Sequence, residues 1–197
     1  MRTLRLHEII SLPLVALVTA TAWSQGTQES VYRVVAYVGG GASLYAASAG
    51  TPSGLSTDVS KFGPAATVRV MWQPDHMLGV GLESGWTKLY SYTVSGPTSG
   101  KMYYSQVPLY VVWSMKFWDQ LNVLGGYGYS HVITNLDYAG TVTVATWSMG
   151  WLAACSYECP ITRTLGIAGE LKWITPIETH DSAMTLQIQL VWNILEY

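Results

Sequence analysis

Charged residues are scarce in this 197-residue sequence, since Asp, Glu, Lys and Arg together make up 11%. Ordinary globular proteins carry about 25%. The 10 basic and 12 acidic residues leave a formal net charge of −2, and no run of basic residues occurs. A chain without a positive patch has little electrostatic attraction for a phosphate backbone, so we expect no nucleic-acid partner.

Long apolar runs are also missing. After the N-terminus, no uninterrupted apolar stretch reaches the roughly 18 residues that identify a transmembrane helix. The sequence nevertheless is 49% hydrophobic and holds 9 Trp and 13 Tyr. Low charge and abundant aromatic residues without a spanning helix favour a transmembrane β-barrel, in which apolar side chains occupy alternate positions.

Cysteine is nearly absent, and Cys155 and Cys159 lie close together in the chain. Their C-x-x-x-C spacing excludes a C-x-x-C redox motif, and no cluster of His or Asp accompanies them, so we expect neither a metal site nor a cofactor. In an oxidising compartment the two residues can either bridge a local turn or remain free thiols.

The first 22 residues have the organisation of a secretory signal peptide. Arg2 and Arg5 supply a positive segment, Ile9 to Val18 an apolar segment, and Ala20-Thr21-Ala22 a small-residue cleavage site. We therefore expect residues 1–22 to be removed and residues 23–197 to form one domain outside the cytoplasm.

The C-terminal segment, residues 183–197, shows the clearest periodicity. Its even positions from Met184 to Ile194 are apolar, whereas Thr185, Gln187 and Gln189 between them are polar. A period of two residues predicts a β-strand with one apolar and one polar face. The segment is also long enough for the roughly 9–11 residues that a tilted strand needs to cross a bilayer.

Similar alternation recurs along the chain and predicts eight strands, at residues 31–47, 62–72, 77–94, 102–117, 121–134, 142–157, 162–175 and 183–197. Short turns follow the second, fourth and sixth strands, and longer loops occupy residues 48–60, 95–100, 135–141 and 176–183. This layout predicts an all-β fold, an eight-stranded antiparallel up-and-down transmembrane β-barrel with its short turns in the periplasm. Side chains fill a barrel of this size, so we expect no wide pore.

The polar positions of the strands collect the charged residues of the predicted lumen: Arg33, Arg69, Glu83, Lys116, Glu170 and Lys172. Arg69 and Glu83 nearly face each other across the hairpin around Pro74, so we expect an ion pair between them. Paired charges are tolerated in a narrow lumen, whereas isolated ones are not. The set predicts a polar plug; a gated ion path or a ligand cavity is the alternative.

Aromatic residues of the apolar face fall into two bands, as expected for the girdles at the two membrane interfaces. One band lies near the short turns (Trp72, Trp113, Phe117 and Trp192) and the other near the long loops (Trp86, Tyr90, Tyr92, Tyr103 and Tyr129). A secreted lipocalin-like binding barrel would turn its apolar face inward. The polar face is instead rich in Gly, Ser, Ala and Thr, which suits a crowded lumen better than a solvated exterior.

Candidate catalytic groups are few. Ser130 and His131 are adjacent, so a strand directs their side chains to opposite faces and they cannot form a dyad. His180, Asp181 and Ser182 share a predicted loop without a defined geometry. A lipid-modifying acyl hydrolase is therefore only an alternative, and we assign no catalytic residue and expect no enzyme.

The signal, the alternating strands, the segment Gln106 to Val111 and the terminal aromatic Tyr197 together resemble the small outer-membrane β-barrel family of Gram-negative bacteria, OmpA/OmpX-like. In detail the chain is similar to the outer membrane protein β-barrel domain. The resemblance implies an outer-membrane location in contact with membrane lipid, and recognition of the C-terminus by the barrel assembly machinery. It also implies a structural or surface-interaction role, with the loops meeting a ligand or a host partner; a narrow, porin-like channel is the alternative.

Two residues depart from the family pattern. Tyr197 is out of phase with the outward series, which ends at Ile194, so either a bulge near Leu195 restores its position or the assembly machinery recognises this end differently. Pro108 lacks a backbone donor inside a predicted central strand. The alternation on both sides of Pro108 predicts that the strand continues through it.

Overall fold

The computed structural model describes residues 32–46, 57–74, 77–94, 100–118, 120–137, 141–178 and 181–197. The expected signal peptide and His180 lie outside these residues. The described part is almost entirely strand: β1 (Arg33–Tyr45), β2 (Thr57–Ser60), β3 (Phe62–Gln73), β4 (Leu78–Val94), β5 (Gly100–Trp118), β6 (Leu121–Asp137), β7 (Thr141–Pro160), β8 (Leu165–Pro176) and β9 (Ala183–Glu196). Within it, no helix has the length and apolar character needed to cross a membrane.

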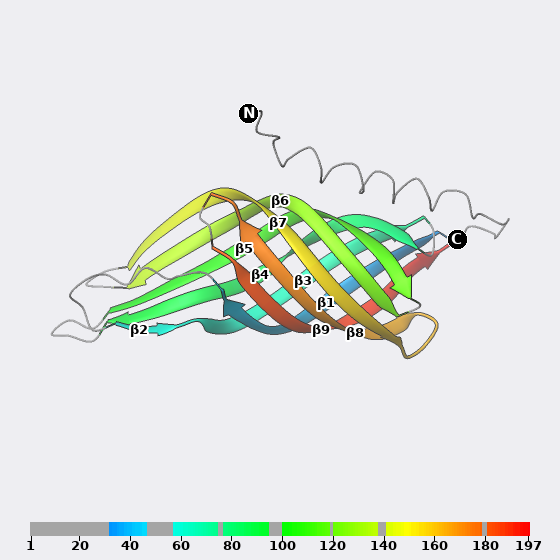
Figure 1. The fold of residues 1–197 in the computed structure, drawn as a ribbon, viewed down its shortest axis with the longest axis horizontal. Helices are drawn as coiled ribbons and strands as arrows, with labels where there is room; N and C mark the ends of the chain where they lie inside the picture. The colour runs from blue at the N-terminus through cyan, green and yellow to red at the C-terminus, as the bar shows by residue number, and fades with distance from the viewer. Residues whose placement is uncertain are drawn as a thin grey trace, which may run out of the picture. The chain divides into compact units, whose positions relative to one another are not determined.

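The strands close into a ring (Figure 1). From β3 onward each strand pairs antiparallel with the next one in the sequence, and β1 joins the two ends by pairing with both β3 and β9. This confirms the eight-stranded antiparallel up-and-down barrel. Every strand of the ring has a hydrogen-bonded neighbour on both sides, so the barrel wall is closed.

The short strand β2 is a difference from the prediction, which made residues 48–60 one loop. Only Lys61 separates β2 from β3, and both pair with β4, β2 at residues 91–94 and β3 at residues 80–87. β4 is long enough to extend beyond β3, and β2 pairs with this extension.

The two faces of the wall have opposite character. Along β3 the inward residues from Gly63 to Met71 are buried, and the alternate residues Val68 and Val70 are exposed. Along β9 Gln187 and Gln189 are buried while their apolar neighbours are exposed. A polar interior with an apolar exterior suits a barrel surrounded by lipid. The lipocalin-like alternative, which requires the reverse, is therefore wrong.

The predicted end of the sixth strand at residue 157 is also wrong, because β7 continues to Pro160 and the chain turns at residues 161–164. Cys155 and Cys159 are therefore four residues apart on one strand, about 13 Å at an extended rise. A disulfide requires Cα atoms within about 7 Å. Both residues are free, exposed thiols, which is the second of the two alternatives that the sequence left open.

Of the two alternatives for the C-terminus, the structure has the bulge. The register of β1 with β9 shifts between Val34 and Val35, which pair with Leu195 and Asn193. The extra residue on β9 returns Tyr197 to the outer face, where its ring stacks on that of Tyr32, with centroids 5.6 Å apart. The C-terminal aromatic residue thus joins the outward series despite its position in the sequence.

β5 continues through Pro108 as predicted. The register between β4 and β5 passes from the pair Ser84 and Leu109 to the pair Thr87 and Gln106, with no pair at Pro108. The ladder is therefore interrupted where proline has no N–H to donate. The Ser84 hydroxyl donates instead to the Pro108 carbonyl at 2.8 Å.

The close approach of β5 to β6 at Gly128 yields a prediction. A Cβ at Gly128 would lie 2.8 Å from Tyr110 Cα and would also contact the Leu109 carbonyl, whereas a Cβ at Gly125 of the same strand meets nothing within 4 Å. We expect Gly128→Ala to reduce the free energy of unfolding by about 1–3 kcal/mol through overpacking, and Gly125→Ala to leave it unchanged. Urea unfolding in detergent micelles, followed by the gel mobility difference between boiled and unboiled samples, measures both. Equal midpoints for the two variants would contradict the prediction.

Candidate functional site

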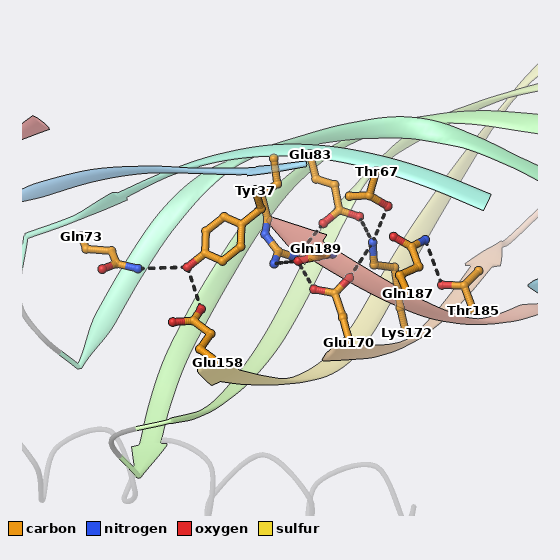
Figure 2. Close-up of polar contacts among 11 residues, drawn as sticks. Tyr37, Thr67, Gln73, Glu83, Glu158, Glu170, Lys172, Thr185, Gln187 and Gln189 are labelled. Carbon is orange, nitrogen blue, oxygen red and sulfur yellow. Dashed lines mark hydrogen bonds and ion pairs between the residues drawn. The ribbon is translucent and has the colours of Figure 1, made fainter. Parts of the chain in front are cut away.

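Four charged side chains meet in the middle of the lumen (Figure 2). Arg69 comes from β3, Glu83 from β4, and Glu170 and Lys172 from β8; we name them the charge quartet. Each side chain is at most 1% exposed. The quartet thus lies away from solvent, where an isolated charge would be strongly destabilising.

Within the charge quartet each cation contacts both carboxylates. Arg69 Nη1 lies 3.0 Å from Glu83 Oε2 and 2.7 Å from Glu170 Oε2. Lys172 Nζ lies 2.5 Å from Glu83 Oε1 and 2.9 Å from Glu170 Oε1. The two positive and two negative charges cancel, so the lumen buries no net charge here.

Strand register places these side chains together. Arg69 and Glu83 are direct partners of β3 and β4, so the ion pair expected from the hairpin is present. Glu170 and Lys172 are two residues apart on β8 and therefore share its inward face. Because β1 and β9 separate β3 from β8 in the ring, the quartet joins strands that are not neighbours.

Neutral side chains complete the polar contacts around the quartet. Arg69 Nη2 donates to Gln189 Oε1 at 3.2 Å, and Lys172 Nζ donates to Thr67 Oγ1 at 3.1 Å. The Arg69 guanidinium also lies over the Tyr37 ring, 4.4 Å from its centroid. Sequence reasoning did not single out Tyr37, Thr67 or Gln189, although their inward position along the strands was a usable signal.

The two other predicted lumen charges, Arg33 and Lys116, lie at the turn end of the barrel. We use this name for the end that holds the short turns, the start of β1 and the end of β9. Arg33 Nη2 contacts Glu196 Oε1 at 3.3 Å, and both side chains are partly exposed. Lys116 is half-buried. Both line a cavity separate from the charge quartet, so the predicted set of six divides into four central and two terminal residues.

Seven of the nine predicted interface aromatics are exposed on the apolar face: Trp72, Trp86, Tyr103, Trp113, Phe117, Tyr129 and Trp192. Tyr90 and Tyr92 differ. A bulge between Lys88 and Tyr90 changes the register of β4, so that Leu89 is buried and Tyr92 is only 8% exposed. An extra residue reverses the alternation beyond it, which the sequence pattern did not reveal.

The redirected tyrosines join a cluster at the loop end, the opposite end of the barrel. The tyrosine cluster consists of Tyr45, Tyr90, Tyr92 and Tyr104, with the Tyr90 ring centroid 4.7 Å from those of Tyr45 and Tyr104 and 5.2 Å from that of Tyr92. The hydroxyls of Tyr45 and Tyr104 both donate to the carboxylate of Asp181, the latter at 2.9 Å. This cluster ties β1, β4 and β5 to the segment before β9.

The candidate catalytic residues are not brought together. The Ser130 hydroxyl is buried in the lumen 2.6 Å from Tyr110 Oη. His131 instead packs against Trp147, with ring centroids 4.7 Å apart. Asp181 is bound by tyrosines, as described above. Among the described residues, no group of three or more His, Cys, Asp or Glu could hold a metal ion.

At the loop end, β7 extends beyond β8, whereas β6 remains paired with β5 as far as Asp137 (Figure 1). β7 pairs with β8 only from Gly150 onward, whereas its pairing with β6 begins at Thr141. Residues 141–147 are exposed on both faces of the strand. We name residues 141–147 the exposed ribbon, because within the described parts of the chain only β6 pairs with them.

Several solved structures of bacterial proteins are similar to this chain. Ail of Yersinia pestis, in complex with the heparin analogue sucrose octasulfate, is 5% identical, with a TM-score of 0.53 over 86% of this chain and 100% of that one. OprG of Pseudomonas aeruginosa is 10% identical, with a TM-score of 0.45 over 85% and 98%. Neisserial surface protein A is 12% identical, with a TM-score of 0.46 over 84% and 100%.

No curated protein matches the chain. The family model of the outer membrane protein beta-barrel domain, by contrast, matches residues 10–193, nearly the whole sequence. This match agrees with the closed ring, the polar lumen and the apolar exterior described above. The chain belongs to the outer membrane protein beta-barrel domain family and is a β-barrel of the bacterial outer membrane.

Proposed function

We propose that this protein is a closed barrel that presents a binding surface for an extended polypeptide outside the cell. The exposed ribbon is the observation that carries the proposal. The family's short turns lie in the periplasm, so its long loops and the ribbon face outward. The chain then acts by surface interaction rather than by passing solutes.

The lumen supports the closed state at two levels. The charge quartet joins β3, β4 and β8 through four ion contacts of 2.5–3.0 Å. Towards the loop end, the tyrosine cluster packs around the buried Asp181 carboxylate. A solute would have to separate both sets of contacts to cross the barrel.

The exposed ribbon has the chemistry of a strand that accepts another strand. Beyond Ser148 and Met149, which bond residues 178 and 177, β7 pairs with β6 alone among the described residues, so its other edge has unpaired backbone groups. The sequence Thr141 to Ser148 holds five β-branched residues before Trp147, and no charge or proline. Edge strands of natural proteins normally carry a charged residue or a proline, which prevents pairing with another strand. An edge without them favours addition of a further strand.

Side chains of the ribbon add an apolar contact surface. Val142 and Val144 are 54% and 56% exposed on one face, and Trp147 is 58% exposed on the other. Backbone pairing would supply affinity, and these side chains would supply selectivity. Ail was solved with a bound heparin analogue, so one barrel of this fold takes a ligand; the ligand of this chain follows from its own ribbon.

A variant of the ribbon tests the binding proposal. Val144→Pro removes a backbone donor and disrupts pairing with Thr134, whereas Val144→Thr retains a β-branched strand residue. On an array of random extended peptides, we expect the wild type and Val144→Thr to bind a common set and Val144→Pro to bind it at least about tenfold more weakly. A difference of this size corresponds to about 1.4 kcal/mol. Equal binding by all three proteins, each shown to be folded by its gel mobility shift, would contradict the proposal.

The closed state is tested by electrical recording. We expect the refolded wild type to show no steady conductance in planar lipid bilayers, because the lumen is filled by paired charges and aromatic rings. Regular single-channel openings in the wild type would instead favour the narrow-channel alternative. The protein used should have a β-rich circular dichroism spectrum and a gel mobility that shifts on boiling. An absence of conductance then comes from folded protein.

The charge quartet also sets an expected stability. Glu83→Gln leaves Arg69 and Lys172 with a single carboxylate, and breaking a buried pair in this way costs about 3–5 kcal/mol. The matched control Arg33→Gln removes a partly exposed pair with Glu196 and should change the free energy of unfolding by no more than about 1 kcal/mol. Urea unfolding in micelles measures both, and a Glu83→Gln midpoint equal to that of the control would show that the quartet does not stabilise the barrel.

A further inference from the structure

The cavity at the turn end has no role in the proposed function. Its volume is about 430 Å³, and its lining comes from β1, β3, β5, β7, β8, β9 and the turn after β7. Ligand pockets usually measure about 300–1,000 Å³. The cavity is therefore large enough for a small solute.

Tyr37 separates this cavity from the charge quartet. Its side chain lines the cavity, and its ring packs against the Arg69 guanidinium at 4.4 Å. The Tyr37 hydroxyl donates to Glu158 Oε1 at 2.8 Å, and Gln73 Nε2 lies 3.5 Å from it (Figure 2). The Tyr37 ring contacts Arg69 on its face and Glu158 and Gln73 at its hydroxyl. It therefore forms the inner wall of the cavity, and the charge quartet lies on the other side of it.

The charges that line the cavity are unequal in number. Arg33, Lys116 and Arg163 are cationic, and Glu158 and Glu196 are anionic. Glu196 is paired with Arg33, and Glu158 accepts the tyrosine hydroxyl. Neither Lys116 nor Arg163 contacts a carboxylate within the described parts of the chain. The lining therefore carries an excess positive charge with two cationic groups available to a ligand.

A third donor points to the same chemistry. Arg33 Nε is buried and has no hydrogen-bond partner among the described residues. A buried donor without a partner is destabilising, and more so when it is charged. An oxyanion in the cavity would be bound by charge-assisted hydrogen bonds, for which Arg and Lys are the usual donors.

We propose that the turn-end cavity is a binding site for a small water-soluble oxyanion, a phosphate or a carboxylate, held by Arg33, Lys116 and Arg163. The site is independent of the exposed ribbon, which lies at the other end of the barrel. Since the family's turn end faces the periplasm, the ligand is a periplasmic solute. Glu158 and Glu196 also line the site and would repel an anion placed against them. A bound anion must therefore either donate a hydrogen bond to these carboxylates or leave them in contact with water.

Calorimetric titration of the folded mature chain in uncharged dodecyl maltoside micelles tests the site. The probes are inorganic phosphate, succinate and, as a cation of similar size, choline. We expect saturable one-site binding of phosphate or succinate and no binding of choline. The double variant Lys116→Gln/Arg163→Gln should weaken anion binding at least about tenfold, since hydrogen bonds to charged groups are stronger than those between neutral groups.

Two controls separate the site from general charge effects. The double variant Lys116→Arg/Arg163→Lys retains both charges and should bind the anion within a few-fold of the wild type. Lys101→Gln removes an exposed lysine at the start of β5, outside the cavity, and should change nothing. If the folded wild type gives no saturable heat with either anion, or if Lys116→Gln/Arg163→Gln binds as tightly as the wild type, the proposal is overturned.

Discussion

The barrel depends on the mutual neutralisation of four charges in a lumen too narrow to hydrate them. Arg69, Glu83, Glu170 and Lys172 are each at most 1% exposed, and every charge has two opposite partners. Burying a single carboxylate or ammonium would be strongly unfavourable, so the four can only be accommodated together. Their geometry in turn requires the correct register of β3 with β4 and the correct position of β8 across β1 and β9. The quartet therefore makes the closed ring and the register of distant strands mutually dependent.

The wall and the lumen follow from one pattern. A strand directs alternate side chains to opposite faces, so an apolar exterior leaves the remaining positions for small and polar residues. Gly128 shows how tight the interior is, because even one Cβ there would contact β5. The same crowding explains why Tyr110 and Ser130 bond each other directly at 2.6 Å. Small inward residues allow the few large ones to fill the space between them.

Alternation predicted most of the fold from the sequence, including strand number, direction and the faces of the quartet residues. The prediction failed where a strand contains a bulge or continues beyond its predicted end. The bulge at Leu89 could not be read from the sequence, because Tyr90 and Tyr92 continue an apolar series whichever face they occupy. The end of β7 was placed too early because Pro160 is compatible with a strand terminus as well as with a turn. The bulge near the C-terminus was predictable, since Tyr197 broke a series whose phase was already known.

The sequence predicted which face of its strand each site residue occupies better than it predicted which residues that side chain contacts. The alternation of side chains places Arg69 inside the barrel but does not tell which strands lie opposite it. Its contacts with Glu170 and Tyr37 come from strands far away in the sequence. The same limit applies to Lys116 and Arg163, which approach one cavity only because β5 and the turn after β7 end on the same side. The charge quartet lies between the two ends of the lumen. An oxyanion at the turn end and a polypeptide at the exposed ribbon would then meet different faces of one barrel without exchanging solute through it.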